Sequence, residues 1–250
     1  MKQVLRMKTI METDQKRKKW RWMIPVFVLL LAATAFLIYT GQYYHAEKSA
    51  YDALESDETV EVMQTEYGWL FDGPSETDAL IFYPGGKVEE TAYAPLLHDL
   101  AGQGMDACLV KMPFRLAVFG INKANHIMKQ YDYENWYIGG HSLGGVMAAA
   151  YASEHSSELC GVYMLAAYPA KPLDEKTTAT TIYGSEDGVL NMEKMRNAKQ
   201  YLPEGSKEHV IKGGNHAQFG NYGKQDGDGI ADISPDEQQH KTVELILQAK

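Results

Sequence analysis

The stretch from residue 136 to residue 152 constrains the fold of this chain more than any other. The β-type residues 136–138 lead into Gly140-His141-Ser142-Leu143-Gly144, and small, helix-favouring residues follow at 146–152. A strand, a sharp turn and a helix in this order are the context of a nucleophile elbow, in which a serine sits on a strained turn. Glycine at both ends of the pentapeptide removes Cβ atoms that would clash with neighbouring backbone. A chance match is the alternative, since ordinary composition gives the pentapeptide in about a tenth of chains this long.

Strands and helices alternate from residue 79 onward. We predict strands at 60–65, 68–71, 79–83, 107–112, 136–140, 159–165, 178–183 and 209–211. We predict helices at 89–102, 118–130, 146–152 and 189–202, and a last helix after the capping box Ser234-Pro235-Asp236-Glu237. The first two strands form a hairpin. The alternation predicts an α/β fold, with a mostly parallel sheet and helices on both of its faces.

The N-terminal region has a different composition from the rest of the chain. Residues 1–22 hold eight Lys and Arg against two acidic side chains, although the whole chain has a net charge of −9. Residues 23–41 carry no charge, and a run of about 20 apolar residues spans a bilayer as a helix. Tryptophan before this run and tyrosine at its end fit interfacial aromatic belts. The competing interpretation is a cleaved signal peptide, which the length of the run and the lack of a small-x-small site disfavour.

These features divide the chain into four parts. We expect a basic cytoplasmic tail at 1–22, a transmembrane anchor at 23–41, a polar stem at 42–58 and an α/β domain at 59–250. The positive-inside rule places the N-terminus in the cytoplasm and the α/β domain outside it. The chain is therefore expected to be a single-pass protein of the cell membrane. A nucleic-acid binder is disfavoured, because its positive charge would lie on the folded domain.

Ser142 is a candidate nucleophile, and a serine nucleophile requires a base that an acid orients. His216 is the best base, because it lies in a loop, Gly213-Gly214-Asn215-His216-Ala217, directly after the last short strand. The candidate acid is Asp187, in the loop after the preceding strand. Glu186 is the competing carboxylate beside it.

The order Ser142, Asp187, His216 is that of α/β-hydrolases and differs from the orders in chymotrypsin and subtilisin. Together with the elbow, the segments Gly-Ser-Glu-Asp at 184–187 and Gly-Gly-Asn-His at 213–216 make residues 60–250 resemble an α/β-hydrolase. The resemblance is to the compact, lidless, single-domain type that includes dienelactone-hydrolase-like and small bacterial esterase-like members. Dienelactone hydrolases proper carry a cysteine nucleophile, so Ser142 argues against their substrate.

The resemblance implies an α/β-hydrolase fold and ester hydrolysis that requires no metal and no organic cofactor. It also implies an oxyanion hole in which the backbone N–H of Leu143 is joined by that of Gly86 or Lys87. Such a sheet would not place the strands of Cys108 and Cys160 side by side, and strands are about 4.8 Å apart, so no disulfide is expected. Both cysteines are interpreted as small buried residues.

Three further segments leave alternatives open. Phe114, Leu116 and Phe119 either line an acyl pocket or pack against a helix, and His141 is a further candidate for lining the site. The acidic segment 226–232 hints at a calcium loop, but its spacing breaks the EF-hand pattern, which favours an acidic turn. The nine-residue connection 169–177 holds two prolines and is too short for a helical lid. It favours an open site and short-chain esters, although an anchored domain would also lie near long lipids.

The sequence thus predicts a membrane-anchored, extracytoplasmic serine hydrolase that acts on carboxylic esters. The substrate would be a small-molecule or envelope ester, and the sequence identifies no protein partner. Thioesterases, acyltransferases and peptidases use the same triad, and the scaffold does not choose among them. A non-catalytic, membrane-tethered binding module is the alternative from another class, against which the complete triad argues.

Overall fold

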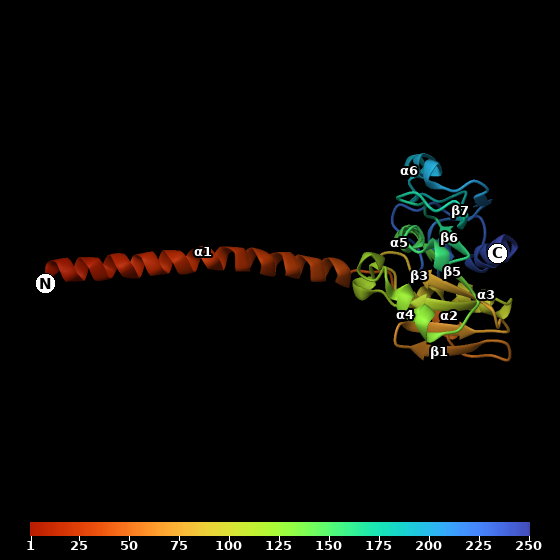
Figure 1. The fold of residues 1–250 in the computed structure, drawn as a ribbon, viewed down its shortest axis with the longest axis horizontal. Helices are drawn as coiled ribbons and strands as arrows, with labels where there is room; N and C mark the ends of the chain where they lie inside the picture. Colours follow the sequence, from red (N-terminus) through yellow and green to blue (C-terminus); the bar gives the residue numbers. More distant parts are fainter. The chain divides into compact units, whose positions relative to one another are not determined.

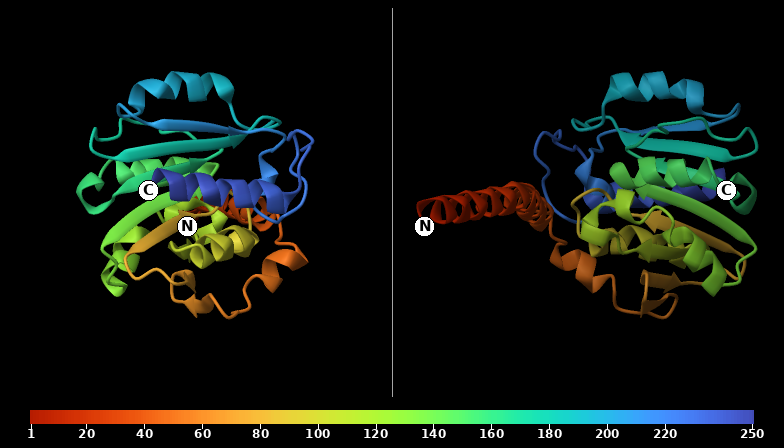
Figure 2. Two further views of the ribbon diagram at one scale, coloured as in Figure 1. Left: turned by 90° about the vertical axis from the view of Figure 1, so that its right-hand side faces the viewer. Right: turned by 60° about the vertical axis from the view of Figure 1, so that its left-hand side comes forward.

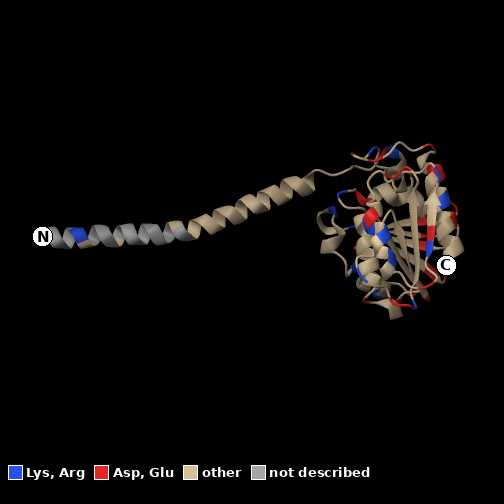
Figure 3. Cartoon of the chain, turned by 90° about the horizontal axis from the view of Figure 1, so that it is seen from above, with Lys and Arg blue, Asp and Glu red and all other residues tan. Residues whose placement is uncertain are grey.

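The computed structural model describes residues 1, 6, 7, 11, 20 and 22–250 with their side chains, and the intervening residues only as part of a helix. It separates the chain into two units, Met1–Gln42 and Tyr43–Lys250 (Figure 1). The first unit is the single helix α1, Lys2–Gly41. Its section Trp22–Gly41 has a mean hydropathy of 2.3 and is long and apolar enough to cross a membrane, although a signal sequence would also meet this criterion. Figure 3 shows this section without a charged side chain.

The second unit is built on one sheet of eight strands in the order β1-β2-β4-β3-β5-β6-β7-β8. The strands are β1 Glu61–Thr65, β2 Gly68–Asp72, β3 Asp78–Tyr83, β4 Asp106–Val110, β5 Asn135–His141, β6 Gly161–Leu165, β7 Thr178–Gly184 and β8 Lys207–Ile211. β2 pairs antiparallel with both β1 and β4. All pairs from β4 to β8 are parallel. The predicted hairpin and the predicted, mostly parallel sheet are both confirmed.

Helices cover both faces of this sheet (Figures 1 and 2). The α-helices are α2 Lys48–Asp52, α3 Ala94–Gly102, α4 Lys123–Gln130, α5 Leu143–Ala152, α6 Met192–Ala198 and α7 Pro235–Ala249. The central strand β3 is buried throughout, and its side chains alternate between two cores, as a strand with two covered faces requires. Leu80 and Phe82 belong to the core under α3 and α7. Ala79 and Ile81 belong to the core under α4 and α5.

Two predicted helices begin later than expected. In place of a helix from residue 118, a short 3-10 turn, η3 Ala117–Phe119, ends there, and α4 starts only at Lys123. Another 3-10 turn, η2 Pro113–Arg115, precedes it. In place of a helix from residue 189, α6 starts after Asn191, whose side chain accepts a hydrogen bond from the Lys194 N–H at 2.9 Å. The predicted N-cap of the last helix is confirmed, since Ser234 Oγ accepts from the Glu237 N–H at 3.1 Å.

The predicted stem at 42–58 is wrong from residue 43 onward, because this segment is part of the folded domain. Tyr44 forms a bridge with Val88, and the Glu47 N–H donates to the Asn221 carbonyl at 2.8 Å. Ala50 in α2 is completely buried. We call residues 43–58 the strap. The strap packs on the domain, and its polar side chains lie on its outer side.

The two cysteines are both free thiols, but their environments differ. Cys108 lies in β4 and is buried, as predicted. The prediction for Cys160 is wrong, since its side chain is exposed. The reason is that β6 begins at Gly161, two residues after the predicted start of this strand, so Cys160 lies outside the sheet. Two strands, β3 and β5, separate β4 from β6, in agreement with the expected absence of side-by-side pairing.

Candidate active site

The turn between β5 and α5 has the geometry of a nucleophile elbow. Ser142 is the single residue between the two elements, and its φ of 52° and ψ of −122° are strained for a residue with a Cβ atom. Such a conformation costs on the order of 1–3 kcal/mol and persists only where the surroundings enforce it. Here they do, because a Cβ atom at Gly144 would lie 2.1 Å from the Tyr83 carbonyl oxygen and one at Gly140 would lie 2.5 Å from it. The two glycines therefore let the turn approach the end of β3 closely.

His216 and Asp187 form a buried pair. His216 follows β8, Asp187 follows β7, and His216 Nδ1 lies 2.9 Å from Asp187 Oδ2. Their side chains are only 2% and 1% exposed. The other oxygen, Asp187 Oδ1, accepts hydrogen bonds from the N–H groups of Val189 and Leu190 at 2.9 and 2.8 Å. The carboxylate is thus held on both sides.

Glu186, the competing carboxylate, is placed elsewhere. Its side chain is exposed and accepts a hydrogen bond from Ser185 Oγ at 2.8 Å. Between the two acids, only Asp187 meets the histidine. The loops of Asp187 and His216 lie close together because β7 and β8 are neighbouring parallel strands, which end at the same edge of the sheet.

The second ring nitrogen of His216 remains available for chemistry. With Nδ1 donating to the carboxylate of Asp187, Nε2 carries no proton and is an acceptor. Nε2 is buried and has no hydrogen-bond partner among the described residues. The ring of His216 lies 4.5 Å from the ring of His141, the residue directly before Ser142. The base is therefore placed beside the elbow.

His141 belongs to a network that joins the elbow to the loop after β3. The Gly85 N–H donates to Tyr93 Oη at 3.0 Å, and Tyr93 Oη lies 2.8 Å from His141 Nδ1. Since the hydroxyl accepts from Gly85, its own proton is free to go to His141 Nδ1. Burial, and next the proximity of His216, lowers the pKa of His141 well below its usual value. Burial therefore favours the neutral form of His141.

The loop after β3 supplies the candidate oxyanion donors. Leu143 is the first residue of α5, so its backbone N–H belongs to the electropositive end of that helix. A Cβ atom at Gly86 would lie 2.9 Å from Leu143 Cδ2, which places Gly86 next to the elbow. The N–H of Lys87 instead donates to the Arg115 carbonyl at 2.9 Å. Of the two residues that the sequence left open, the geometry favours Gly86.

The candidate pocket residues differ in how far their side chains are exposed. Phe114 and Phe119 are exposed, with their rings 5.7 Å apart, and Leu116 between them is half-buried. The bond between Lys87 and Arg115 joins their loop to the oxyanion loop. His141, by contrast, is almost completely buried, so it supports His216 instead of meeting solvent. An acyl-binding role for the two phenylalanines stays a prediction.

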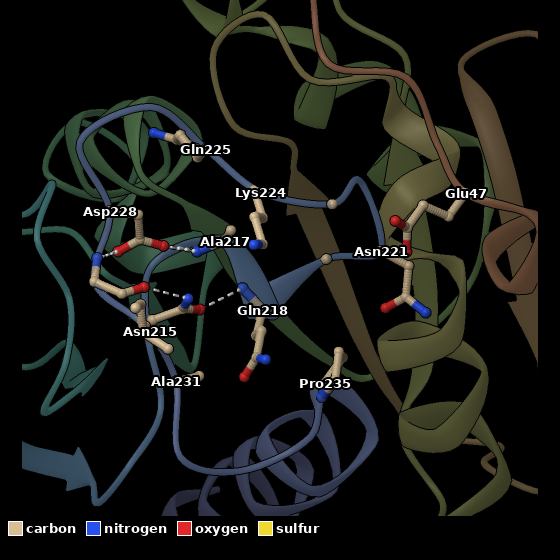
Figure 4. Close-up of a pocket in the computed structure, with 14 residues that line it drawn as sticks. Glu47, Asn215, Ala217, Gln218, Asn221, Lys224, Gln225, Asp228, Ala231 and Pro235 are labelled. Carbon is tan, nitrogen blue, oxygen red and sulfur yellow. Dashed lines mark hydrogen bonds between the residues drawn. The ribbon is translucent and has the colours of Figure 1, made fainter.

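Sequence reasoning missed the role of Asp228. Its carboxylate accepts hydrogen bonds from the N–H groups of Gly188, His216 and Ala217, at 3.1, 3.2 and 2.8 Å. Figure 4 shows the contact with Ala217. Asp228 therefore ties the loop of the acid to the loop of the histidine. The Asp-Gly repeat at 226–229 was the available signal, but it was interpreted as an acidic turn and not as a support for the loops of Asp187 and His216.

A cavity of about 390 Å³ lies beside the loop of Asp228, and Figure 4 shows the residues that line it. Its polar lining includes Glu47, Gln218, Asn221 and Lys224. Ser142 is not part of the lining. This cavity is therefore not the place where Ser142 would attack a carbonyl group.

Substituting Asp228 tests its positioning role. We expect Asp228→Asn to lower kcat by about 100-fold, because a misplacement of about 1 Å at a catalytic group costs that much. The amide nitrogen would meet backbone donors where an acceptor is needed. The matched control is Asp226→Asn, an exposed aspartate of the same loop, which should leave kcat unchanged. Equal kcat values for the two variants, measured on one soluble ester, would contradict the role of Asp228.

Comparison with known proteins identifies the family of the chain. Residues 79–240 match the model of a family described as the alpha/beta hydrolase family. Comparison with curated protein sequences gives no match.

Solved structures with the same fold include several esterases. The esterase Rv0045c of Mycobacterium tuberculosis superposes with a TM-score of 0.57 at 10% identity, over 80% of this chain and 95% of that one. Carboxylesterase CesB of Bacillus subtilis gives 0.53 at 10% identity, over 86% and 98%. The thioesterase domain of the curacin biosynthetic pathway gives 0.54 at 11% identity, over 76% and 100%. At these identities the likeness concerns the fold alone, whereas the family model covers more than half of the chain. The chain therefore belongs to the alpha/beta hydrolase family.

Proposed function

We propose that the chain is a serine hydrolase that cleaves carboxylic esters. The observation that carries the proposal is the buried pair of His216 and Asp187. The ring of His216 lies 4.5 Å from that of His141, the residue directly before the strained Ser142, and its Nε2 has no hydrogen-bond partner among the described residues. Strain at a non-glycine residue and a buried acceptor without a partner both cost free energy. A functional role explains why both occur at the same edge of the sheet.

In the proposed mechanism, Ser142 Oγ attacks the ester carbonyl while His216 Nε2 accepts its proton. Asp187 holds the ring in the required tautomer and stabilises the imidazolium. The N–H groups of Leu143 and Gly86 would stabilise the tetrahedral oxyanion, an effect of roughly 3–4 kcal/mol per donor. The imidazolium then protonates the departing alkoxide, and an acyl-enzyme remains. Water, deprotonated by His216, releases the acid and restores the serine.

The connection between β6 and β7 is short, and this is the position at which larger hydrolases of this fold would carry a lid. Residues 169–177, between β6 and β7, contain no helix. We infer an open, pre-formed site that prefers short acyl chains on soluble esters. The solved neighbours favour esters over other acyl compounds, although one of them is a thioesterase.

A series of p-nitrophenyl esters of increasing chain length tests the substrate class. With the purified chain in a mild detergent, kcat/KM should be highest for short acyl groups and should exceed that for matched thioesters and anilides. Ser142→Ala is the control for background hydrolysis. A maximum at long chains would contradict the open-site proposal, and faster cleavage of the thioesters would favour the second candidate, a thioesterase.

We further propose that α1 anchors the hydrolase in the cell membrane, with the N-terminus in the cytoplasm. The support is the apolar section Trp22–Gly41 preceded by residues 1–22, which carry eight basic and two acidic side chains. Protease added to intact cells should then degrade residues 43–250. Protection in intact cells, with degradation only after lysis, would contradict the orientation.

A further inference from the structure

An apolar patch lies on the loop between β4 and α4. It consists of Phe114, Val118 and Phe119, whose side chains are 48%, 45% and 53% exposed. Large side chains exposed together mark an interaction surface more often than single exposed residues do. We call these three residues the loop patch.

Basic residues flank the loop patch in the sequence, although Lys111 forms an ion pair with Glu90 at 3.2 Å. The segment from Lys111 to Lys123 contains a third basic residue, Arg115, and no acidic residue. The chain as a whole has a net charge of −9, although its first 22 residues are strongly basic. The domain therefore has a negative net charge, whereas the segment 111–123, which contains the loop patch, has a positive one. Aromatic side chains beside basic ones are the composition of segments that bind the surface of anionic membranes.

The conformation of this loop is held in place. Phe114 and Arg115 both have positive φ values, 54° and 58°, and so does Lys87, at 61°. The Lys87 N–H donates to the Arg115 carbonyl at 2.9 Å. Three non-glycine residues in the left-handed region persist only where the surrounding structure requires it. The loop thus presents a fixed surface.

The covalent chain keeps the loop patch close to the proposed anchor. The guanidinium carbon of Arg115 lies 3.3 Å from the centre of the Tyr43 ring, a cation–π contact. Tyr43 follows Gly41, the last residue of the apolar section, by two residues. Two residues of chain extend at most about 7 Å. In any arrangement of the two units, Tyr43 therefore stays within that distance of the end of the section.

We propose that the loop patch docks on the lipid surface of the membrane that α1 spans. The proposal rests on the anchor proposed above, and it deepens the proposed function. A tether of two residues holds the patch at a high local concentration of lipid, so a small patch is sufficient for contact. Since Lys87 joins the patch to the loop of Gly86, docking would hold the oxyanion edge of the domain against the membrane surface. Short acyl esters carried by molecules at that surface would then reach the site alongside the soluble esters proposed above.

A polarity-sensitive dye on the full chain tests the docking. In Val118→Cys combined with Cys160→Ser, the dye reacts at position 118, because Cys108 is buried and its burial raises the pKa of the thiol. The control is the unmodified chain labelled at Cys160. This thiol lies at the start of β6, and the loop patch follows the end of β4; β3 to β6 are parallel, so the two lie at opposite edges of the sheet. Both proteins are reconstituted in phosphatidylcholine–phosphatidylglycerol vesicles that contain a lipid-borne quencher.

We expect the dye at position 118 to emit at shorter wavelength and to be quenched at least about threefold more than the dye at Cys160, since docked apolar groups reach 5–10 Å into the membrane interface. Adding Phe114→Ser and Phe119→Ser should remove most of that difference. Equal quenching of the two dyes in protein that alkaline carbonate does not extract would overturn the docking and leave the anchor intact. Extraction of the full chain by carbonate would overturn both.

Discussion

Replacing Ser142 by alanine is expected to lower kcat for ester hydrolysis by about a million-fold, the loss seen when the nucleophile of a serine triad is removed. Alanine has no hydroxyl group, so there is no nucleophile to attack the carbonyl and no serine proton for His216 to accept. Alanine also keeps the shape of the turn, because φ of 52° is imposed by the backbone contacts of Gly140 and Gly144 and not by the hydroxyl. The variant should therefore fold normally, which circular dichroism and urea unfolding would verify.

The matched control is Ser153→Ala, at the other end of the same helix. Ser153 is the C-cap of α5, as Ser142 is its N-cap, and its hydroxyl donates to the Ala150 carbonyl at 2.8 Å. Any general effect of removing a helix-end serine would lower kcat in both variants, whereas the loss of a nucleophile affects one. A folded Ser142→Ala protein with wild-type kcat would refute the triad. A non-catalytic binding module would then be the better interpretation of the domain.

The residues of the candidate triad were predictable because each one is marked by a local pattern. Ser142 lies between a β-type run and a helix-favouring run, and Asp187 and His216 each follow a strand within a glycine-containing loop. In a parallel sheet the ends of successive strands meet at one edge. Local patterns and this one topological rule were therefore sufficient to predict that the loops of Asp187 and His216 meet, and His216 Nδ1 lies 2.9 Å from Asp187 Oδ2. The role of Ser142 stays a prediction.

What the sequence did not reveal depends on contacts between distant segments. Asp228 acts through backbone N–H groups of two other loops, and Tyr93 acts through Gly85 and His141. Neither residue carries a local signature of such a role, since each hydrogen bond depends on how the loops meet. The strap after residue 43 was misread for the same reason: its composition is polar, and only its contacts with the domain show that it is packed.

The loop from 113 to 119 shows a further limit of periodicity. Its last two residues were predicted to begin a helix, but they belong to the 3-10 turn η3, and α4 begins only at Lys123. Before them, Phe114 and Arg115 have positive φ values, which give the loop a conformation that its composition does not indicate. These values depend on the bond between Arg115 and Lys87, two segments far apart in the sequence. The spacing of apolar residues in one segment carries no information about its contacts with a distant segment.

Replacing Asp187 by asparagine is expected to lower kcat by about ten thousand-fold, the loss that follows when the histidine of a triad takes the wrong tautomer. The surroundings of Asp187 make the reason specific. Oδ1 accepts from the N–H groups of Val189 and Leu190, so an asparagine must turn its carbonyl oxygen toward these two donors. Its NH2 group then faces His216 Nδ1, which has to accept, and the ring proton moves to Nε2. That nitrogen can no longer take the proton of Ser142.

The neighbouring Glu186→Gln is the matched control, because the side chain of Glu186 is exposed and accepts a hydrogen bond from Ser185 Oγ, away from His216. It should keep kcat within about twofold of the wild type, as surface substitutions away from special features change free energies by no more than about 0.5 kcal/mol. A large loss in Glu186→Gln together with a small one in Asp187→Asn would show that the acid had been misassigned. The two variants differ by one position and remove the same charge, so a change in net charge cannot account for the contrast. Because the amide at 187 would still satisfy both backbone donors, Asp187→Asn should also retain its urea midpoint, and the loss of kcat would then report on the tautomer of His216 alone.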